Sequence, residues 1–189
     1  MAVKTMTMTT GAGLYNEGWH EVTIRQAKQD VWKGADGKTS TYVDLLFEDY
    51  ADNMNLRVFE VRNKETNEEF KLVNLFRYAM AGIIEKLDDP TGKKPILQYD
   101  DDVTNLVGTH INVFIYKNKD GYSEFFDTIA PVEQEGEHYS FSADRVTALK
   151  NAAEKNFSRS NKSKHLTNGT VLKGTPVTNT ASSDAEIPF

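Results

Sequence analysis

Apolar and polar residues alternate along five stretches of the chain, which is the pattern of strands with one buried face. These stretches cover residues 19–28, 39–48, 55–61, 110–117 and 122–129. Their inward positions are expected to carry Val22 and Ile24, then Val43, Leu45 and Phe47, and later Ile111, Val113 and Ile115. Leu46 interrupts the second stretch by placing an apolar residue outward. The pattern predicts a mainly β protein.

Between the third and fourth stretches the apolar period lengthens. Over residues 70–87 apolar side chains recur every three or four positions from Leu72 to Leu87, as on one face of an amphipathic helix that stops before Pro90. Three strands, a helix and two strands is the order of a five-stranded OB-fold barrel, with one helix between strands 3 and 4. Such a barrel binds on its second and third strands and in its first and fourth inter-strand loops. An open α+β sheet remains the alternative, because periodicity does not require closure.

The length of 189 residues and the hydrophobic content of 39% suit one domain with flexible ends. Residues 1–13 are rich in Thr and Gly and are expected to be a flexible lead-in, and residues 14–132 hold the barrel. The segment 133–157 carries a short predicted helix over residues 142–157. From residue 158 to residue 189, Ser, Thr, Asn, Lys and Gly dominate, which predicts a disordered tail.

The net charge of −6 at first argues against a nucleic-acid partner. The acidic surplus lies on the body, however, whereas residues 150–173 hold six Lys or Arg and only Glu154. A phosphate backbone can still bind if a few cations line one groove. The chain has no cysteine, no 18-residue apolar run and no apolar block near its start, so we expect a cytoplasmic protein without disulfides.

Residues 184–189 form the most specific motif of the chain. Asp184 and Glu186 precede Ile187, Pro188 and Phe189. This segment resembles the C-terminal tip of bacterial and phage single-stranded DNA-binding proteins, although Ala185 departs from the denser acidic run of that family and is expected to weaken steering. The order of the body over roughly residues 15–130, including the strand GKTSTYVDLLFE, is similar to the phage-type members of the family.

The resemblance implies a non-enzymatic protein that coats single-stranded DNA during replication, recombination or repair. It also implies that the tip recruits other proteins of these processes. Buried in a partner's pocket, Ile187 and Phe189 contribute about 1.5–3 kcal/mol each, and Pro188 limits the entropy lost on docking. Many such proteins are dimers or tetramers, and the sequence leaves a homo-oligomer open.

Single-stranded nucleic acid needs aromatic side chains on which bases stack and cations that contact phosphates. The candidates lie where an OB fold binds its ligand. They are Trp32, Lys33 and Lys38 in the first loop, Tyr42, Arg57, Phe59 and Arg62 on or beside the second and third strands, and Lys117, Lys119 and Tyr122 around the last hairpin.

Three other functions remain open from the residues alone. One is a recombination mediator or strand-annealing protein, another is a virion or scaffold component, and the third is a metal-dependent nuclease using Asp100, Asp101 and Asp102. Adjacent carboxylates without a neighbouring His are more typical of a solvated turn than of a metal site. We predict no catalytic residue, no metal and no cofactor.

Overall fold

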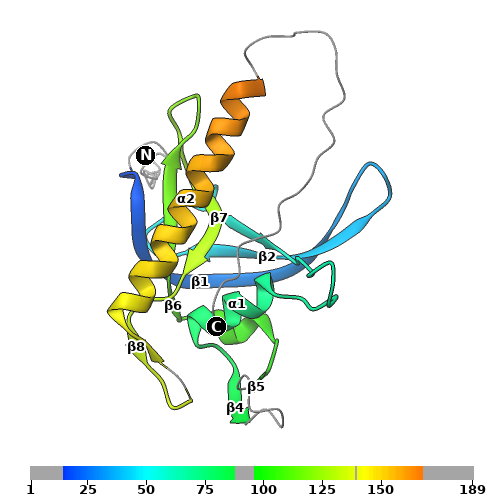
Figure 1. Cartoon of the computed structure of the whole chain (residues 1–189), viewed down its shortest axis with the longest axis vertical. Helices are drawn as coiled ribbons and strands as arrows, with labels where there is room; N and C mark the ends of the chain where they lie inside the picture. The colour runs from blue at the N-terminus through cyan, green and yellow to red at the C-terminus, as the bar shows by residue number, and fades with distance from the viewer. Residues whose placement is uncertain (1–14, 88–95, 139, 168–189) are drawn as a thin grey trace, which may run out of the picture.

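The long first strand, β1 (Gly18–Lys33), organises the sheet in the computed structural model, which describes residues 15–87, 96–138 and 140–167. Five antiparallel strands lie in the order β3-β2-β1-β6-β7 (Figure 1). The other four are β2 (Thr39–Phe47), β3 (Leu56–Phe59), β6 (His110–Lys117) and β7 (Ser123–Ala130). Because the edge strands β3 and β7 contact each other, the sheet forms a nearly closed barrel.

Strand β1 changes partner along its length. Residues 18–23 pair with β6, and the remainder pairs with β2. The register shifts between Ile24 and Gln26, near the point of change, and a bulge of this kind bends a strand. The bend allows one strand to belong to both halves of the barrel.

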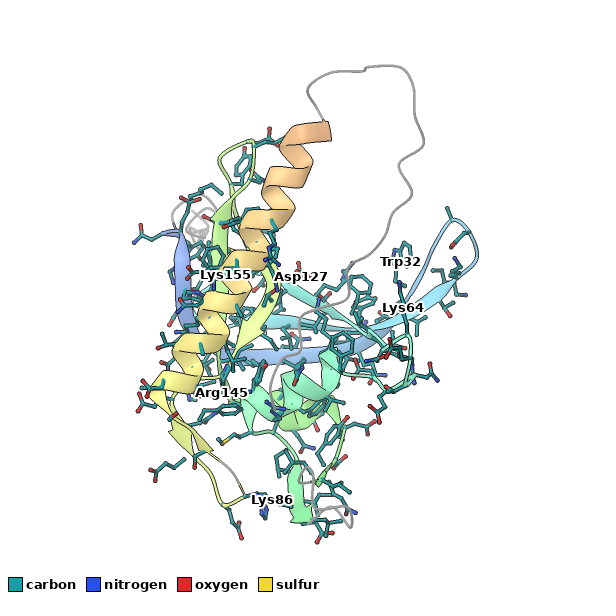
Figure 2. The ribbon with its side chains drawn as sticks, in the orientation of Figure 1. Trp32, Lys64, Lys86, Asp127, Arg145 and Lys155 are labelled. Carbon is teal, nitrogen blue, oxygen red and sulfur yellow. The ribbon has the colours of Figure 1, made fainter. Side chains whose placement is uncertain are left out.

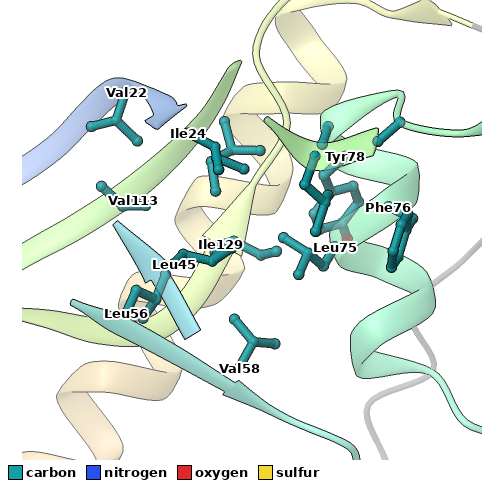
Figure 3. Packing of buried hydrophobic residues seen from close by; sticks show 14 of the residues in the cluster. Val22, Ile24, Leu45, Leu56, Val58, Leu75, Phe76, Tyr78, Val113 and Ile129 are labelled. Carbon is teal, nitrogen blue, oxygen red and sulfur yellow. The ribbon is translucent and has the colours of Figure 1, made fainter. Parts of the chain in front are cut away.

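The interior of the barrel confirms the inward positions predicted from the alternation. Val43, Leu45 and Ile111 are each at most 1% exposed, and all three belong to one buried cluster. Helix α1 (Lys71–Ala79) adds Leu75 and Phe76 to this cluster (Figure 3). The alternation therefore identified the buried face of these strands correctly.

The predicted helix over residues 70–87 is wrong in its second half. Glu69 stabilises the first turn of α1, because its carboxylate accepts hydrogen bonds from the backbone N–H groups of Lys71, Leu72 and Val73. Met80 ends the helix in a left-handed conformation. Gly82 follows with φ of +63°, and a Cβ there would lie 2.4 Å from the backbone oxygen of Asp100.

The chain beyond α1 forms elements that the sequence pattern did not predict. Strand β4 (Ile83–Leu87) pairs with β5 (Ile96–Tyr99), and the short 3-10 helix η1 (Val103–Leu106) precedes β6. The apolar spacing of Ile83 and Leu87 suits a helix, but cross-strand pairing with β5 places both in a hairpin. The helix therefore differs in position from the predicted one, and a hairpin separates it from β6.

The first inter-strand loop is also shorter than predicted. Residues 29–33 continue β1 and pair with residues 39–43 of β2, so Trp32 lies in a strand rather than in a loop. The turn itself is closed by a hydrogen bond from the N–H of Gly34 to the carbonyl of Lys38. We call residues 29–43 the β1-β2 arm, and its outer part around the turn projects from the barrel in Figure 1.

A second helix follows the barrel and is longer than the predicted one. After the small hairpin of β8 (Gln134–Glu135) and β9 (Ser140–Phe141), α2 covers Ala143–Thr167. The predicted tail was therefore wrong over residues 158–167, which are helical. Neither helix within the described ranges has the length and apolar character to cross a membrane. The rest of the predicted tail, with all five tip residues, and the predicted lead-in lie outside the described residues.

Candidate nucleic-acid interface

Three aromatic side chains meet on the outer face of β1, β2 and β3. The ring centroids of Tyr42 and Phe59 are 5.4 Å apart, and those of Trp32 and Phe59 are 6.5 Å apart. Trp32 is 48% exposed, whereas Tyr42 and Phe59 are half-buried. Figure 2 shows Trp32 on the β1-β2 arm, away from the helix that carries Lys155. We call Trp32, Tyr42 and Phe59 the open aromatic face.

Strand register brings these rings together. Val43 and Val58 point into the core as a directly opposed pair, so the neighbouring pair of Tyr42 and Phe59 points outward. Trp32 pairs with Ser40, two residues along β2 from Tyr42 and therefore on the same face. Aromatic side chains in such diagonal positions reach one another across a sheet.

Arg57 adds a cation to the open aromatic face. Its guanidinium carbon lies 4.4 Å from the centroid of the Tyr42 ring, within the range of a cation–π contact. Its Nη2 also donates to Oδ2 of Asp44 at 3.3 Å. The structure thus brings together four of the residues predicted to bind DNA: Trp32, Tyr42, Arg57 and Phe59.

The predicted lysines of the first loop lie at the tip of the arm. Lys33 is the last residue of β1 and is exposed. Lys38 pairs with Asp36, with 3.1 Å between Nζ and Oδ2. Hydrogen bonds from the side chain of Lys38 and, second, from its backbone N–H lower the pKa of Asp36. Both lysines lie further out along the arm than Trp32.

Arg62 lies just beyond β3, where it stabilises a turn. Its Nε donates to Glu60 at 2.6 Å, and its Nη1 donates to the carbonyl of Asn67 at 3.2 Å. The residue also forms an isolated β-bridge with Glu69. These contacts give Arg62 a structural part in the connection between β3 and α1.

The structure does not bring the β6-β7 hairpin to the open aromatic face. Lys117, Lys119 and Tyr122 lie at this hairpin, and Figure 1 shows its turn well away from the β1-β2 arm. Nζ of Lys117 donates to Oγ of Ser123 at 2.6 Å. Tyr122 is 60% exposed. The predicted site is therefore divided into two separate groups.

A second set of aromatic residues lies under α2. Phe157 of α2 contacts the rings of Phe114, Tyr116 and Phe126, with centroid distances of 5.0–5.3 Å. Trp19 packs edge-on against Phe114 at 5.4 Å. We call Trp19, Phe114, Tyr116 and Phe126 the covered aromatic face.

Polar contacts also hold α2 on the covered aromatic face. Nε1 of Trp19 donates to Glu154 of α2 at 2.8 Å, and Lys150 lies 5.6 Å from the Trp19 ring centroid. Burial lowers the pKa of Lys150. Burial is the larger cause and the hydrogen bond to Glu124 the second of the rise in the pKa of Tyr116 to about 12. These contacts show that Trp19 and Tyr116 support the attachment of α2.

Two residues near the open aromatic face were missed from the sequence. Asp44 lies directly opposite Arg57 in the β2-β3 register, and Asn55 donates a hydrogen bond to its other oxygen. The outward position of Asp44 in the alternating strand was visible in the sequence. Its contact with Arg57 was not, because the register between β2 and β3 depends on the fold.

The acidic run of Asp100, Asp101 and Asp102 lies before β6, where two of its carboxylates accept local hydrogen bonds. Asp102 accepts hydrogen bonds from the N–H and hydroxyl of Thr104 and begins η1. These bonds lower the pKa of Asp102. Asp100 accepts from the N–H of Asp102 at 3.1 Å. Over the described part of the chain, no three His, Asp or Glu side chains are grouped as metal ligands.

Comparisons with known proteins add no family to this description. No protein-family model matches the chain, and no curated protein matches it.

Proposed function

We propose that the protein binds single-stranded DNA on the open aromatic face and the β1-β2 arm, without catalysing a reaction. The observation that carries this proposal is the grouping of Trp32, Tyr42 and Phe59 with Arg57 on one outer face. Aromatic rings and cations together are what a single strand requires. The exposed Lys33 and Lys38 extend the cations along the arm.

The chemistry favours a single strand over a duplex. Bases in a duplex stack on one another, whereas an unpaired base can stack on a protein ring with a contribution of about 1–3 kcal/mol. Every base has a flat face, so the proposed binding tolerates any sequence. Neighbouring strands are about 4.8 Å apart, which lets side chains from β1, β2 and β3 contact neighbouring parts of one nucleic-acid strand.

An OB-type barrel is the finer fold that we infer. A nearly closed barrel of five antiparallel strands is compatible with it, and the open aromatic face lies on the strands that bind ligands in such barrels. The β4-β5 hairpin and α2 are then additions to the basic order. The resemblance of the sequence to single-stranded DNA-binding proteins supports a role in DNA replication, recombination or repair.

Partner recruitment by the tip is a separate part of the proposal. Its sequence basis is the resemblance of Asp184, Glu186, Ile187, Pro188 and Phe189 to the tips of single-stranded DNA-binding proteins. Recruitment places replication, recombination or repair proteins at the coated strand.

The two tryptophans provide a direct test. Trp32 lies on the open aromatic face, and Trp19 lies on the covered one. Oligo(dT) should quench the fluorescence of W19F through Trp32, and W32F should lose this quenching. Binding is measured in parallel by the anisotropy of labelled oligo(dT), with a duplex of equal length as the competitor.

A matched surface variant controls for loss of apolar area. Ile84 in the β4-β5 hairpin is 59% exposed, so I84A should bind oligo(dT) as the wild type does, whereas W32A should bind about tenfold less tightly. The proposal fails if the wild type does not retain oligo(dT) at low salt, or if duplex competes as well as a single strand.

A further inference from the structure

On or beside the strands of the open aromatic face, four cations are each paired with a carboxylate; one of them is Lys28, which lies opposite Asp44 in the β1-β2 register. The pairs are Lys28–Asp30 at 3.3 Å, Lys38–Asp36 at 3.1 Å, Arg57–Asp44 at 3.3 Å and Arg62–Glu60 at 2.6 Å. A phosphate that binds one of these cations must therefore compete with an acidic side chain already present.

The Arg57–Asp44 pair differs from the exposed pairs of the arm. Its side chains are 42% and 29% exposed, compared with 85% and 57% for Lys38 and Asp36. The two residues are directly opposed on β3 and β2. Solvent screens such a partly enclosed pair less than it screens an exposed one.

Asp44 also has a second anchor. Asn55 donates to its Oδ1, and Arg57 donates to its Oδ2. With the carboxylate held in this way, the guanidinium of Arg57 remains over the Tyr42 ring, 4.4 Å from its centroid. Asp44 is thus placed to fix the position of Arg57 on the open aromatic face.

This arrangement occupies two groups that a nucleotide would use. The guanidinium covers one face of the Tyr42 ring, where a base would stack, and the carboxylate takes hydrogen-bond donors that a phosphate would use. We propose that Asp44 is a positioning residue that limits the affinity of the site. The bound strand exchanges the carboxylate for a phosphate on Arg57 and takes the freed face of Tyr42.

The inference rests on the proposed binding of single-stranded DNA and is tested by D44N. Asn keeps the size of Asp and an oxygen acceptor for Asn55, but it removes the charge that holds Arg57. We expect D44N to bind oligo(dT) about three- to tenfold more tightly at low salt. The slope of log K against log salt concentration should stay close to that of the wild type, because Arg57 contacts the same phosphate in both proteins.

Removing an acidic charge strengthens DNA binding to some extent wherever it is removed, so D127N is the matched control. Asp127 pairs with Lys71 at 2.8 Å, and Figure 2 shows it apart from Trp32. D127N should change affinity by less than twofold. R57Q separates the release of Arg57 from the general effect of removing an acidic charge. The gain from D44N should disappear when R57Q is the background, in the D44N/R57Q double variant.

The outcomes distinguish this inference from the proposed function. If the wild type binds oligo(dT) but D44N shows no gain, or if the gain persists in the R57Q background, Asp44 does not limit the site. If neither the wild type nor D44N retains oligo(dT) at low salt, the proposed function fails and the inference fails with it. Urea unfolding of each variant verifies that its fold is intact.

Discussion

The open and covered aromatic faces lie on the same barrel and are built from the same kinds of residue. On the open face, Trp32, Tyr42 and Phe59 contact one another, and Arg57 lies over one ring. On the covered face, Phe157 of α2 packs against three rings of the sheet. Outward aromatic residues in a strand are therefore left accessible or used in packing according to what covers them.

The polar atoms of the two faces differ in the same way. Under α2, the indole N–H of Trp19 and the hydroxyl of Tyr116 donate to the carboxylates of Glu154 and Glu124. Hydrogen-bonded donors of this kind are what a packed interface requires. On the open face the polar groups include the Arg57–Asp44 ion pair, which we propose a phosphate exchanges. The comparison predicts separate effects on affinity and on stability.

The largest expected effect is on DNA affinity, in the double variant W32A/Y42A. Two lost stacking contacts, at about 1–3 kcal/mol each, should weaken oligo(dT) binding at least about thirtyfold. Fluorescence anisotropy at low salt measures this change. Unchanged affinity would show that the open aromatic face is not the binding site.

The next effect is on stability, in F157A. Phe157 is half-buried among three rings, so its truncation should lower the free energy of unfolding by about 2–3 kcal/mol. Urea unfolding measures the loss, and oligo(dT) affinity should stay within twofold of the wild type. A marked rise in affinity would show instead that α2 hides a second DNA-binding surface.

A smaller loss is expected for E154A. Removing the acceptor of the Trp19 indole should lower the free energy of unfolding by about 0.5–1.5 kcal/mol. Asn151 lies one turn earlier on α2 and is exposed, so N151A is the control and should have no measurable effect in urea unfolding. Equal losses in the two variants would mean that the Trp19–Glu154 contact does not stabilise the packing of α2 on the covered aromatic face.

The pH dependence of stability should reveal the raised pKa of Tyr116. Its pKa in the folded protein is raised to about 12, whereas that of an unfolded tyrosine is about 10. The folded state therefore binds this proton more tightly, and the resulting stabilisation is complete below pH 10 and is lost as pH rises towards 12. Urea unfolding at pH 9 and at pH 11 should show a smaller decrease for Y116F than for the wild type. An equal decrease would contradict the assignment.

The smallest effect on affinity is expected from deleting residues 184–189. If the open aromatic face holds the strand and the tip recruits partners, oligo(dT) affinity should remain unchanged or rise slightly. Anisotropy with labelled oligo(dT) measures this outcome. A large loss of affinity would refute the division between a binding body and a recruiting tip.

The sequence predicted the buried faces of the strands because a two-residue period reports burial directly. Val43 and Ile111 are buried as expected. The end of α1 was missed because Ile83 and Leu87 fit both a helix and a hairpin, and Gly82 was the local signal against the helix. The arm was missed because its strands extend past the core, where Val31 is 51% exposed and apolar alternation is no longer required.

The candidate site could be predicted only where one strand determines which way a side chain points. Tyr42 and Phe59 follow from the alternation within their own strands. The grouping with Trp32 and the contact between Asp44 and Arg57 depend on pairing between strands. The separation of Lys117, Lys119 and Tyr122 from this group depends on barrel geometry, which a linear pattern does not contain.

The shared strand β1 gives the protein two levels of local stability. Residues 18–23 pair with β6, which β7 flanks on its other side, and the amide hydrogens bonded to β6 should exchange with solvent only when the barrel opens. Residues 29–33 belong to the projecting arm, so their exchange can proceed by fraying of one hairpin. Single-stranded DNA bound along the arm should slow amide exchange at residues 29–33 and leave exchange at residues 18–23 unchanged. One continuous strand thus contains both the reporter of binding and its internal reference.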